Sequence, residues 1–149
     1  MSLRELYQEI IIDHGKSPRH VGCLSNATHS KMGHNPLCGD KLVLYIQSQD
    51  GIAQDLKFEG NGCAISMASA SLMIESVKGK TIGEIEKLFA DFHYLVMHGK
   101  PAQDSMGKLE AFSGVAEFPI RVKCATLAWH TLKAALANDP NPTSTESSQ

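Results

Sequence analysis

The chain has 149 residues, 42% of them hydrophobic, and a formal net charge of −2. This length suits one domain with a sizeable core, which needs no disulfide bonds to fold. The near-neutral charge argues against a nucleic-acid-binding surface, and no apolar run approaches the roughly 20 residues that cross a bilayer. We therefore expect a cytoplasmic protein without nucleic-acid or membrane partners, whose reduced cysteines serve metal binding or catalysis.

The chain begins with apolar residues at helical spacing. Residues 3–14 have apolar side chains at positions 3, 6, 7, 10 and 11, which predicts an amphipathic helix that ends before Pro18. Residues 17–32 have no clear pattern and predict a loop, with at most one weak strand at 27–32. Cys23 lies in this loop, and we interpret it as a small apolar residue or an idle surface thiol.

Two strands follow, joined by a tight turn. Residues 41–47 are almost continuously apolar, which predicts a strand covered on both faces. Residues 52–59 alternate, with Ile52, Leu56 and Phe58 expected on the buried face. Asp50-Gly51 predicts the hairpin turn between them, because this pair tolerates the positive φ angles of a type I′ turn.

The second half of the chain is helical in pattern. Residues 64–77 are small or apolar on most sides, which predicts a helix packed into the core. Thr81 and Glu84 form a capping box for the next helix. A last helix is predicted after Pro119, with Cys124 near its start.

The remaining segments complete the prediction of the fold. Residues 100–118 predict a connection with one short helical stretch at 108–112, and residues 138–149, rich in Ser, Thr and Pro, predict a disordered tail. We therefore predict a single α+β domain over residues 1–137. It has a small, mostly antiparallel, three-stranded sheet packed against four to five helices.

Three cysteines and one aspartate are candidates for a single metal site. Cys38 and Asp40 flank Gly39, whose missing side chain permits a tight turn. Cys63 follows a Gly-x-Gly turn and Cys124 follows a proline, so we expect both at helix N-termini, where unpaired amides and the helix dipole favour a thiolate. Three thiolates and one carboxylate suit a tetrahedral Zn²⁺, and thiolates also hold iron–sulfur clusters.

Other interpretations of these residues stay open. Buried cysteines are usually core residues, and the pattern Asn-Pro-x-x-Gly at 35–39 also occurs in turns for backbone reasons alone. His29 and His34 lie near Cys38, but we do not assign them as ligands. A purely structural zinc is less favoured, because we expect Asp40 at an exposed edge, and a cysteine hydrolase would need a histidine base that the local sequence lacks.

Three segments of the chain resemble one protein family. Residues 35–40 read Asn-Pro-Leu-Cys-Gly-Asp, residues 58–66 read Phe-Glu-Gly-Asn-Gly-Cys-Ala-Ile-Ser, and residues 121–129 read Arg-Val-Lys-Cys-Ala-Thr-Leu-Ala-Trp. In this order they are similar to the U-type iron–sulfur cluster assembly proteins, IscU and SufU. The similarity extends from the first helix to about Leu136 and implies a fold like that of IscU and of the N-terminal domain of NifU.

Two departures from the IscU pattern favour the SufU branch. Lys123 stands directly before Cys124, where IscU-type scaffolds carry a histidine, and the connection at 99–118 is longer than theirs. Residues 118–123 also contain a single proline, which argues against the Hsp70-type chaperone handover of IscU-type scaffolds.

The resemblance implies a zinc-dependent sulfurtransferase. Cys38 would accept persulfide sulfur from a pyridoxal-phosphate-dependent cysteine desulfurase of the SufS type, and the other three candidate ligands would stay on the metal. Arg121 and Lys123 would stabilise the thiolates or pair with the desulfurase. The alternative is a scaffold that assembles a labile [2Fe–2S] cluster and hands it to downstream acceptor proteins; Lys123 argues against it, since a cationic amine cannot ligate iron.

Overall fold

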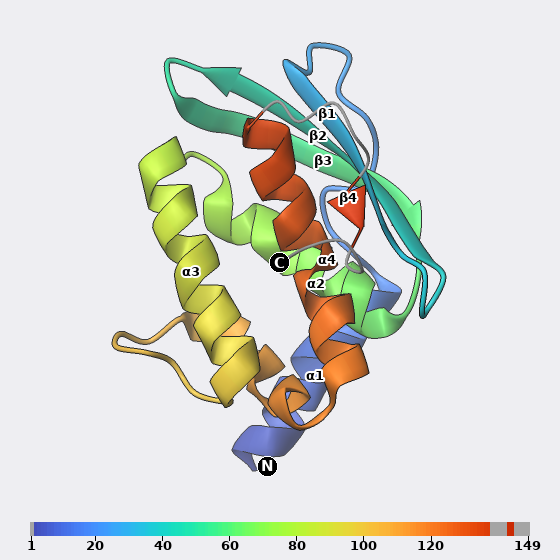
Figure 1. Cartoon of the computed structure of the whole chain (residues 1–149), viewed down its shortest axis with the longest axis vertical. Helices are drawn as coiled ribbons and strands as arrows, with labels where there is room; N and C mark the ends of the chain where they lie inside the picture. The colour runs from blue at the N-terminus through green and yellow to red at the C-terminus, as the bar shows by residue number, and fades with distance from the viewer. Residues whose placement is uncertain (1, 138–142, 145–149) are drawn as a thin grey trace.

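The structure is a computed structural model that describes residues 2–137 and 143–144. A sheet with the strand order β3-β2-β1-β4 lies beside a group of helices (Figure 1). The predicted α+β fold with a small, mainly antiparallel sheet is confirmed. In chain order the elements are α1 (Leu3–Lys16), β1 (His29–Asn35), β2 (Asp40–Gln49), β3 (Ile52–Asn61), α2 (Ala64–Val77), α3 (Ile82–His98), the 3₁₀ helix η1 (Gly107–Glu117), α4 (Pro119–Leu136) and β4 (Thr143–Ser144).

The three long strands pair in sequence order. β1 and β2 are antiparallel, and their register brings Asn35 opposite Asp40. β2 and β3 are also antiparallel, whereas the short strand β4 runs parallel to β1 beside Gly33 and His34. The predicted disordered tail at 138–149 lies outside the described residues except for Thr143–Ser144, which form β4.

The turn between β2 and β3 has the predicted backbone. Asp50 and Gly51 have φ angles of 54° and 74°, so both central residues are in the left-handed region. β2 itself differs from the prediction, because its buried residues alternate: Asp40, Leu42, Leu44 and Ile46. The helices pack against one face of the sheet, and the apolar residues between these positions are only half-buried on the other.

A bulge shifts the buried face of β3. Ala53, Leu56 and Phe58 are buried, whereas the alternation predicted that Ile52 would be buried and Ala53 exposed. Ser48 pairs with Ala53 and Gln47 pairs with Asp55, so Gln54 has no partner opposite it. An extra residue of this kind reverses the alternation of side chains across the bulge.

β1 is longer than the weak strand predicted at 27–32. Its buried residues are Lys31, Gly33 and Asn35, which alternate as the residues of a half-buried strand do. None of them is a large apolar residue, and this explains why the sequence pattern was weak. A glycine is required in the middle of this strand, because a Cβ at Gly33 would overlap the side chain of Thr131 on α4.

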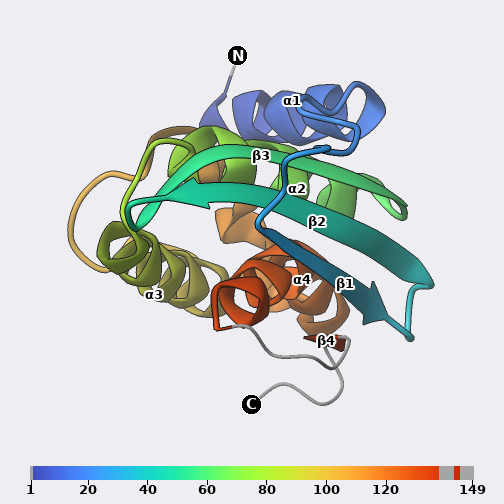
Figure 2. The ribbon, with the colours of Figure 1, turned by 90° about the horizontal axis from the view of Figure 1, so that it is seen from above.

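The helices pack in a continuous layer. Figure 2 shows α1 along α2 on one side of the molecule and α3 beside α4 on the other. α2 is buried on most sides, as predicted, and the capping box of Thr81 and Glu84 is present at the start of α3. Trp129 of α4 stacks on Phe92 of α3 with ring centroids 4.4 Å apart, which ties these two helices together in the core.

The connection before α4 contains a longer helix than predicted. η1 covers residues 107–117, whereas the sequence predicted only a short helical stretch at 108–112. Leu109, Phe112 and Val115 are buried, and their spacing of three residues matches the three residues per turn of a 3₁₀ helix. In the described part of the chain, no helix has the length and apolar character to span a membrane.

Candidate metal centre

The loop of Cys38 is held by the residue that ends β1. The backbone amides of Cys38 and Gly39 donate hydrogen bonds to the Asn35 carbonyl oxygen, at 3.3 and 2.9 Å. The Asn35 side chain accepts a further bond from the amide of Leu37, at 3.2 Å. Gly39 has a φ angle of 72°, a left-handed conformation that favours glycine, and this agrees with its predicted role. The turn leaves the Cys38 side chain exposed.

Asp40 is the first residue of β2 and is fully buried. The prediction that it lies at an exposed edge was wrong, because Asp40 points to the face of the sheet that the helices cover. Its Oδ1 accepts a hydrogen bond from the Cys63 amide at 2.8 Å, and its Oδ2 lies 3.7 Å from the Cys63 Sγ. A Cβ at Gly62 would lie 2.5 Å from Oδ1, so this close approach requires a glycine there.

Cys63 is the N-cap of α2, as predicted. Its Sγ accepts a hydrogen bond from the amide of Ser66 at 3.4 Å. A hydrogen bond from the Cys124 thiol, opposed in part by burial and assisted by the Ser66 amide, lowers the pKa of Cys63 to about 7. Cys63 is nevertheless exposed, so its sulfur is both accessible and partly ionised near neutral pH.

Cys124 differs from its prediction. α4 begins at Pro119, so Cys124 lies in the second turn and not at the helix N-terminus. It is buried, and its Sγ lies 3.3 Å from the Cys38 Sγ. The hydrogen bond to Cys63, together with burial and the contact with Cys38, raises the pKa of Cys124 far above its ordinary value. Of these two thiols, Cys63 is therefore the one that ionises first as pH rises, and Cys124 keeps its proton.

The four candidate side chains lie together. The ligand atoms of Cys38, Asp40 and Cys124 are all within 4.8 Å of one another, and Cys63 lies against Asp40. Two ligands of a tetrahedral Zn²⁺ lie about 3.3–3.8 Å apart when the bonds are about 2.0–2.3 Å long. Three thiolates and one carboxylate are a donor set that suits zinc, and the two printed separations, 3.3 Å between Cys38 and Cys124 and 3.7 Å between Cys63 and Asp40, are of this size. Cys63 lies outside the group of three whose ligand atoms are all mutually close, so it would join the other three through Asp40.

The other residues that the sequence singled out lie outside this cluster. Cys23 is exposed, and no histidine belongs to any group of three or more potential ligands in the described part of the chain. His29 hydrogen-bonds to the Thr28 hydroxyl at 2.9 Å. His34 faces Lys41 across the β1–β2 pair. Neither histidine therefore belongs to the cluster of candidate ligands among the described residues.

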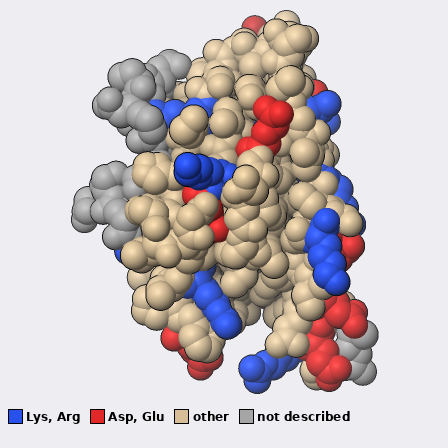
Figure 3. All heavy atoms as spheres, turned by 90° about the vertical axis from the view of Figure 1, so that its right-hand side faces the viewer, with Lys and Arg blue, Asp and Glu red and all other residues tan. Residues whose placement is uncertain are grey.

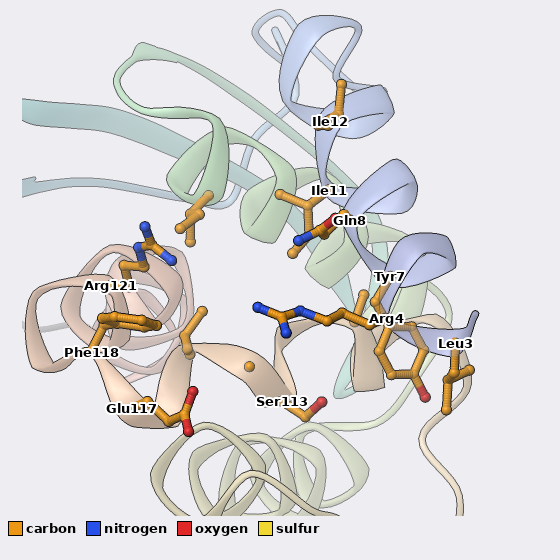
Figure 4. A pocket seen from close by; sticks show the side chains of 14 residues that line it. Leu3, Arg4, Tyr7, Gln8, Ile11, Ile12, Ser113, Glu117, Phe118 and Arg121 are labelled. Atoms are coloured by element: carbon orange, nitrogen blue, oxygen red, sulfur yellow. The ribbon is translucent and has the colours of Figure 1, made fainter. Parts of the chain in front are cut away.

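A groove of about 650 Å³ has lining residues from the helices that carry Cys63 and Cys124, although neither cysteine lines it. It lies between α1, η1 and the start of α4, and Figure 4 shows Arg4 extending into it, with Arg121 on the opposite side beside Phe118. Ile65, two residues after Cys63, forms part of its wall. The Arg121 guanidinium lies over the ring of Phe118, 4.3 Å from its centroid.

Several large apolar residues that line the groove are exposed, among them Leu3, Ile12 and Phe118. Phe118 is 45% exposed, and Ile120, two residues after it, is 56% exposed. Leu37, directly before Cys38, is 57% exposed. Large exposed apolar residues gathered beside one site are typical of a protein-binding surface. The face shown in Figure 3, in contrast, has basic and acidic side chains interspersed over the sheet side of the molecule.

Comparisons with known proteins agree with the fold and the cluster. Residues 6–125 match the family model described as "NifU-like N terminal domain". Over 143 residues the chain is 43% identical to the "Zinc-dependent sulfurtransferase SufU" of Bacillus subtilis, covering 93% of this chain and 94% of the relative. It is 40% identical over 141 residues to the "Iron-sulfur cluster assembly scaffold protein IscU" of Streptococcus pyogenes, covering 93% and 87% of the two chains.

A solved structure has the same fold. The crystal structure of a putative iron–sulfur cluster assembly scaffold protein for the SUF system from Fervidobacterium islandicum superposes with a TM-score of 0.82 at 36% identity, covering 91% of this chain and 99% of that one. The predicted resemblance is therefore confirmed. The chain belongs to the family of NifU-like N-terminal domains, the U-type iron–sulfur cluster assembly proteins.

Proposed function

We propose that this chain is a zinc-dependent sulfur acceptor in iron–sulfur cluster assembly and that Cys38 receives the sulfur. One observation carries the proposal: an exposed sulfur in a short loop contacts a buried sulfur, 3.3 Å away, beside a buried carboxylate. Such a site combines fixed ligands with one that a partner protein can reach. The similarity to the Bacillus subtilis sulfurtransferase supports this proposal over a structural metal site.

Cys38 is a better candidate acceptor than the other exposed thiol, Cys63. The Cys63 amide donates a hydrogen bond to Asp40, and the Cys63 sulfur accepts one from the amide of Ser66 at the start of α2. In the part of the chain that the structure describes, the loop of Cys38 is held by backbone amides that bond to Asn35, and the Cys38 Sγ contacts the Cys124 Sγ. Moving Cys38 out of the cluster therefore breaks fewer contacts than moving Cys63.

The transfer would be a thiol–persulfide exchange. The Cys38 thiolate attacks the outer sulfur of a persulfide on the donor cysteine, and a new S–S bond forms as the donor S–S bond breaks. The donor leaves as a thiolate, and Cys38 becomes the persulfide, so no external oxidant or reductant is consumed. A bound Zn²⁺ would keep Cys38 deprotonated at rest, with Asp40 and the other two cysteines as its remaining ligands.

The donor would be a pyridoxal-phosphate-dependent cysteine desulfurase, the enzyme class that forms persulfides from cysteine. We assign the groove beside the cluster as its docking face. The apolar rim offers area for burial, and the guanidinium groups of Arg4 and Arg121 would pair with carboxylates of the partner. Lys123, half-buried next to Cys124, would add to this positive charge. We place the reaction in the cytoplasm.

The test is desulfurase turnover with matched cysteine variants. We expect Cys38→Ala to abolish the stimulation of alanine formation while its circular dichroism remains that of the parent. Cys23→Ala, which removes an exposed cysteine outside the cluster, should stimulate like the parent. Mass spectrometry should locate the added sulfur atom on the peptide of Cys38. Parental stimulation by Cys38→Ala would contradict the proposal, as would sulfur found only on Cys63.

A second candidate function is the scaffold. The same three cysteines would hold a labile [2Fe–2S] cluster as cargo, and the Streptococcus pyogenes relative is described as a scaffold protein. Lys123 disfavours this candidate, because an ammonium group cannot act as a ligand. Anaerobic incubation with iron and sulfide separates the two. We expect no stable coloured species; a coloured protein that passes its cluster to an apo-protein would favour the scaffold.

A further inference from the structure

Asn35 contacts the cluster in more ways than a turn residue requires. Its side chain is fully buried at the end of β1, and it faces Asp40 across the strand pair. Its carbonyl and Oδ1 hold the loop of Cys38. Its Nδ2 donates a hydrogen bond to the Sγ of Cys124 at 3.6 Å. A single residue is thus linked to three of the four candidate ligands.

The turn alone does not explain why this residue is an asparagine. The bond from the Leu37 amide to Oδ1 is an Asx turn, which an aspartate or a serine forms as well. Among these residues only asparagine also offers an N–H donor to a sulfur. An aspartate would instead place a second carboxylate beside the Cys124 sulfur. The sulfur contact therefore gives a reason for asparagine that the backbone does not.

We propose that Asn35 is a positioning residue of the metal site, which holds Cys124 in place independently of the loop that carries Cys38. The inference rests on the proposed function, in which one sulfur departs and the others stay. The N–H···S bond fixes the direction of the buried sulfur and withdraws electron density from it. Outer-shell bonds of this kind orient a ligand and tune its interaction with the metal.

The first measurement uses Co²⁺ as a spectroscopic probe in place of zinc. We expect Asn35→Ala to shift the sulfur-to-cobalt charge-transfer band to longer wavelength, because the sulfur loses a hydrogen bond that stabilises its electrons. Zinc affinity, measured by competition with a chromophoric chelator, should fall about 10- to 100-fold. Asn26→Ala, at an exposed asparagine in the loop before β1, is the matched control and should change neither quantity.

A second variant separates the sulfur bond from the turn. Asn35→Ser retains an oxygen that accepts from the Leu37 amide but is too short to reach Cys124. It should therefore show the same band shift as Asn35→Ala, with a smaller loss of thermal stability in the metal-free protein. An unshifted band in both variants, even if both unfold at lower temperature, would overturn the proposal and reduce Asn35 to a turn residue.

A third variant tests independence from the Cys38 loop. In a Cys38→Ala background the remaining ligands must hold the metal, so adding Asn35→Ala should weaken Co²⁺ binding at least as much as in the parent. A loss of the Asn35 effect in this background would show that Asn35 acts only through the loop, which overturns the proposal.

The outcomes also separate this inference from the proposed function. A parent protein that gives the band shift on Asn35 substitution but never accepts sulfur would refute the sulfurtransferase and leave the role of Asn35 standing. A parent protein with no charge-transfer band would refute the metal site and, with it, the role of Asn35.

Discussion

β2 has a tight turn at each end. One turn carries Cys38 of the candidate metal site and the other only reverses the chain, so a comparison shows which features belong to the site. At the far end, Asp50 and Gly51 turn the chain with two positive φ angles and are exposed. At the near end, the turn that carries Cys38 has one positive φ angle, at Gly39, and its flanking Asp40 is buried. The near end meets the side chains of Cys63 at the start of α2 and Cys124 in α4, whereas at the far end the Gly51 carbonyl accepts a hydrogen bond from the backbone amide of Ile82 at the start of α3.

The two turns should differ most in how much zinc affinity and stability the protein loses when the aspartate of each turn, Asp40 or Asp50, is replaced by alanine. Asp40→Ala removes a candidate ligand and the acceptor of the Cys63 amide, which costs about 1–3 kcal/mol when a buried donor is left unpaired. Zinc affinity should fall by more than the roughly 10- to 100-fold loss typical of an outer-shell change. Chelator competition and thermal unfolding measure the two effects.

Asp50→Ala is the control for this change. It lies in the exposed turn, where it should leave zinc affinity unchanged and cost no more than about 1–2 kcal/mol, the cost of a left-handed alanine. If the two variants lost zinc affinity equally, the assignment of Asp40 as a ligand would be wrong.

Gly39 and Gly51 allow a closer comparison of the two turns, because their backbone conformations are nearly the same. Gly39 and Gly51 have φ angles of 72° and 74°, and a Cβ at either would meet nothing within 4 Å. Each change to alanine should therefore cost a similar roughly 1–2 kcal/mol of stability. Only Gly39→Ala should also slow sulfur transfer to Cys38, measured by desulfurase turnover. An equal loss of transfer in Gly51→Ala would mean that stability, not the site, limits transfer.

The smallest effect is electrostatic and concerns Cys63 in the metal-free protein. Its pKa of about 7 predicts that alkylation of Cys63 by iodoacetamide rises with pH around a midpoint near 7, as followed by mass spectrometry. Because the pKa of Cys63 is lower in the folded than in the unfolded protein, its contribution to stability is fully present only above the pKa of an ordinary thiol, and it is lost as pH falls through about 7. A midpoint near the pKa of an ordinary thiol would contradict the hydrogen bond that the Cys124 thiol donates to Cys63.

The sequence was most informative where local chemistry decides structure. The turn at Asp50-Gly51 and the capping box of Thr81 and Glu84 follow from the conformations and hydrogen bonds of neighbouring residues. The position of Cys63 at the start of α2 follows in the same way, from the Gly-x-Gly turn before it.

The sequence was least informative where the contacts are long-range. The buried face of β1 consists of Lys31, Gly33 and Asn35, which no hydrophobic pattern identifies. The burial of Asp40 depends on which face of the sheet the helices cover, and that is set by packing. Cys124 took its expected place in the cluster, but its burial and its retained proton come from neighbours in α2 and in the Cys38 loop. Asn35 was recognised only as part of a turn, since the sulfur it contacts lies 89 residues away.

The stacking of Trp129 on Phe92 gives experimenters an internal fluorophore. This indole is the sole tryptophan of the chain, is 1% exposed, and donates to Ser69, whose hydroxyl donates to the carbonyl of Ala125 next to Cys124. Its emission therefore reports on the hydrophobic interior directly behind the sulfurs. If a variant loses its metal ion but keeps a blue-shifted emission, only the metal site has changed. A red shift would show that the core around Trp129 has become exposed to water.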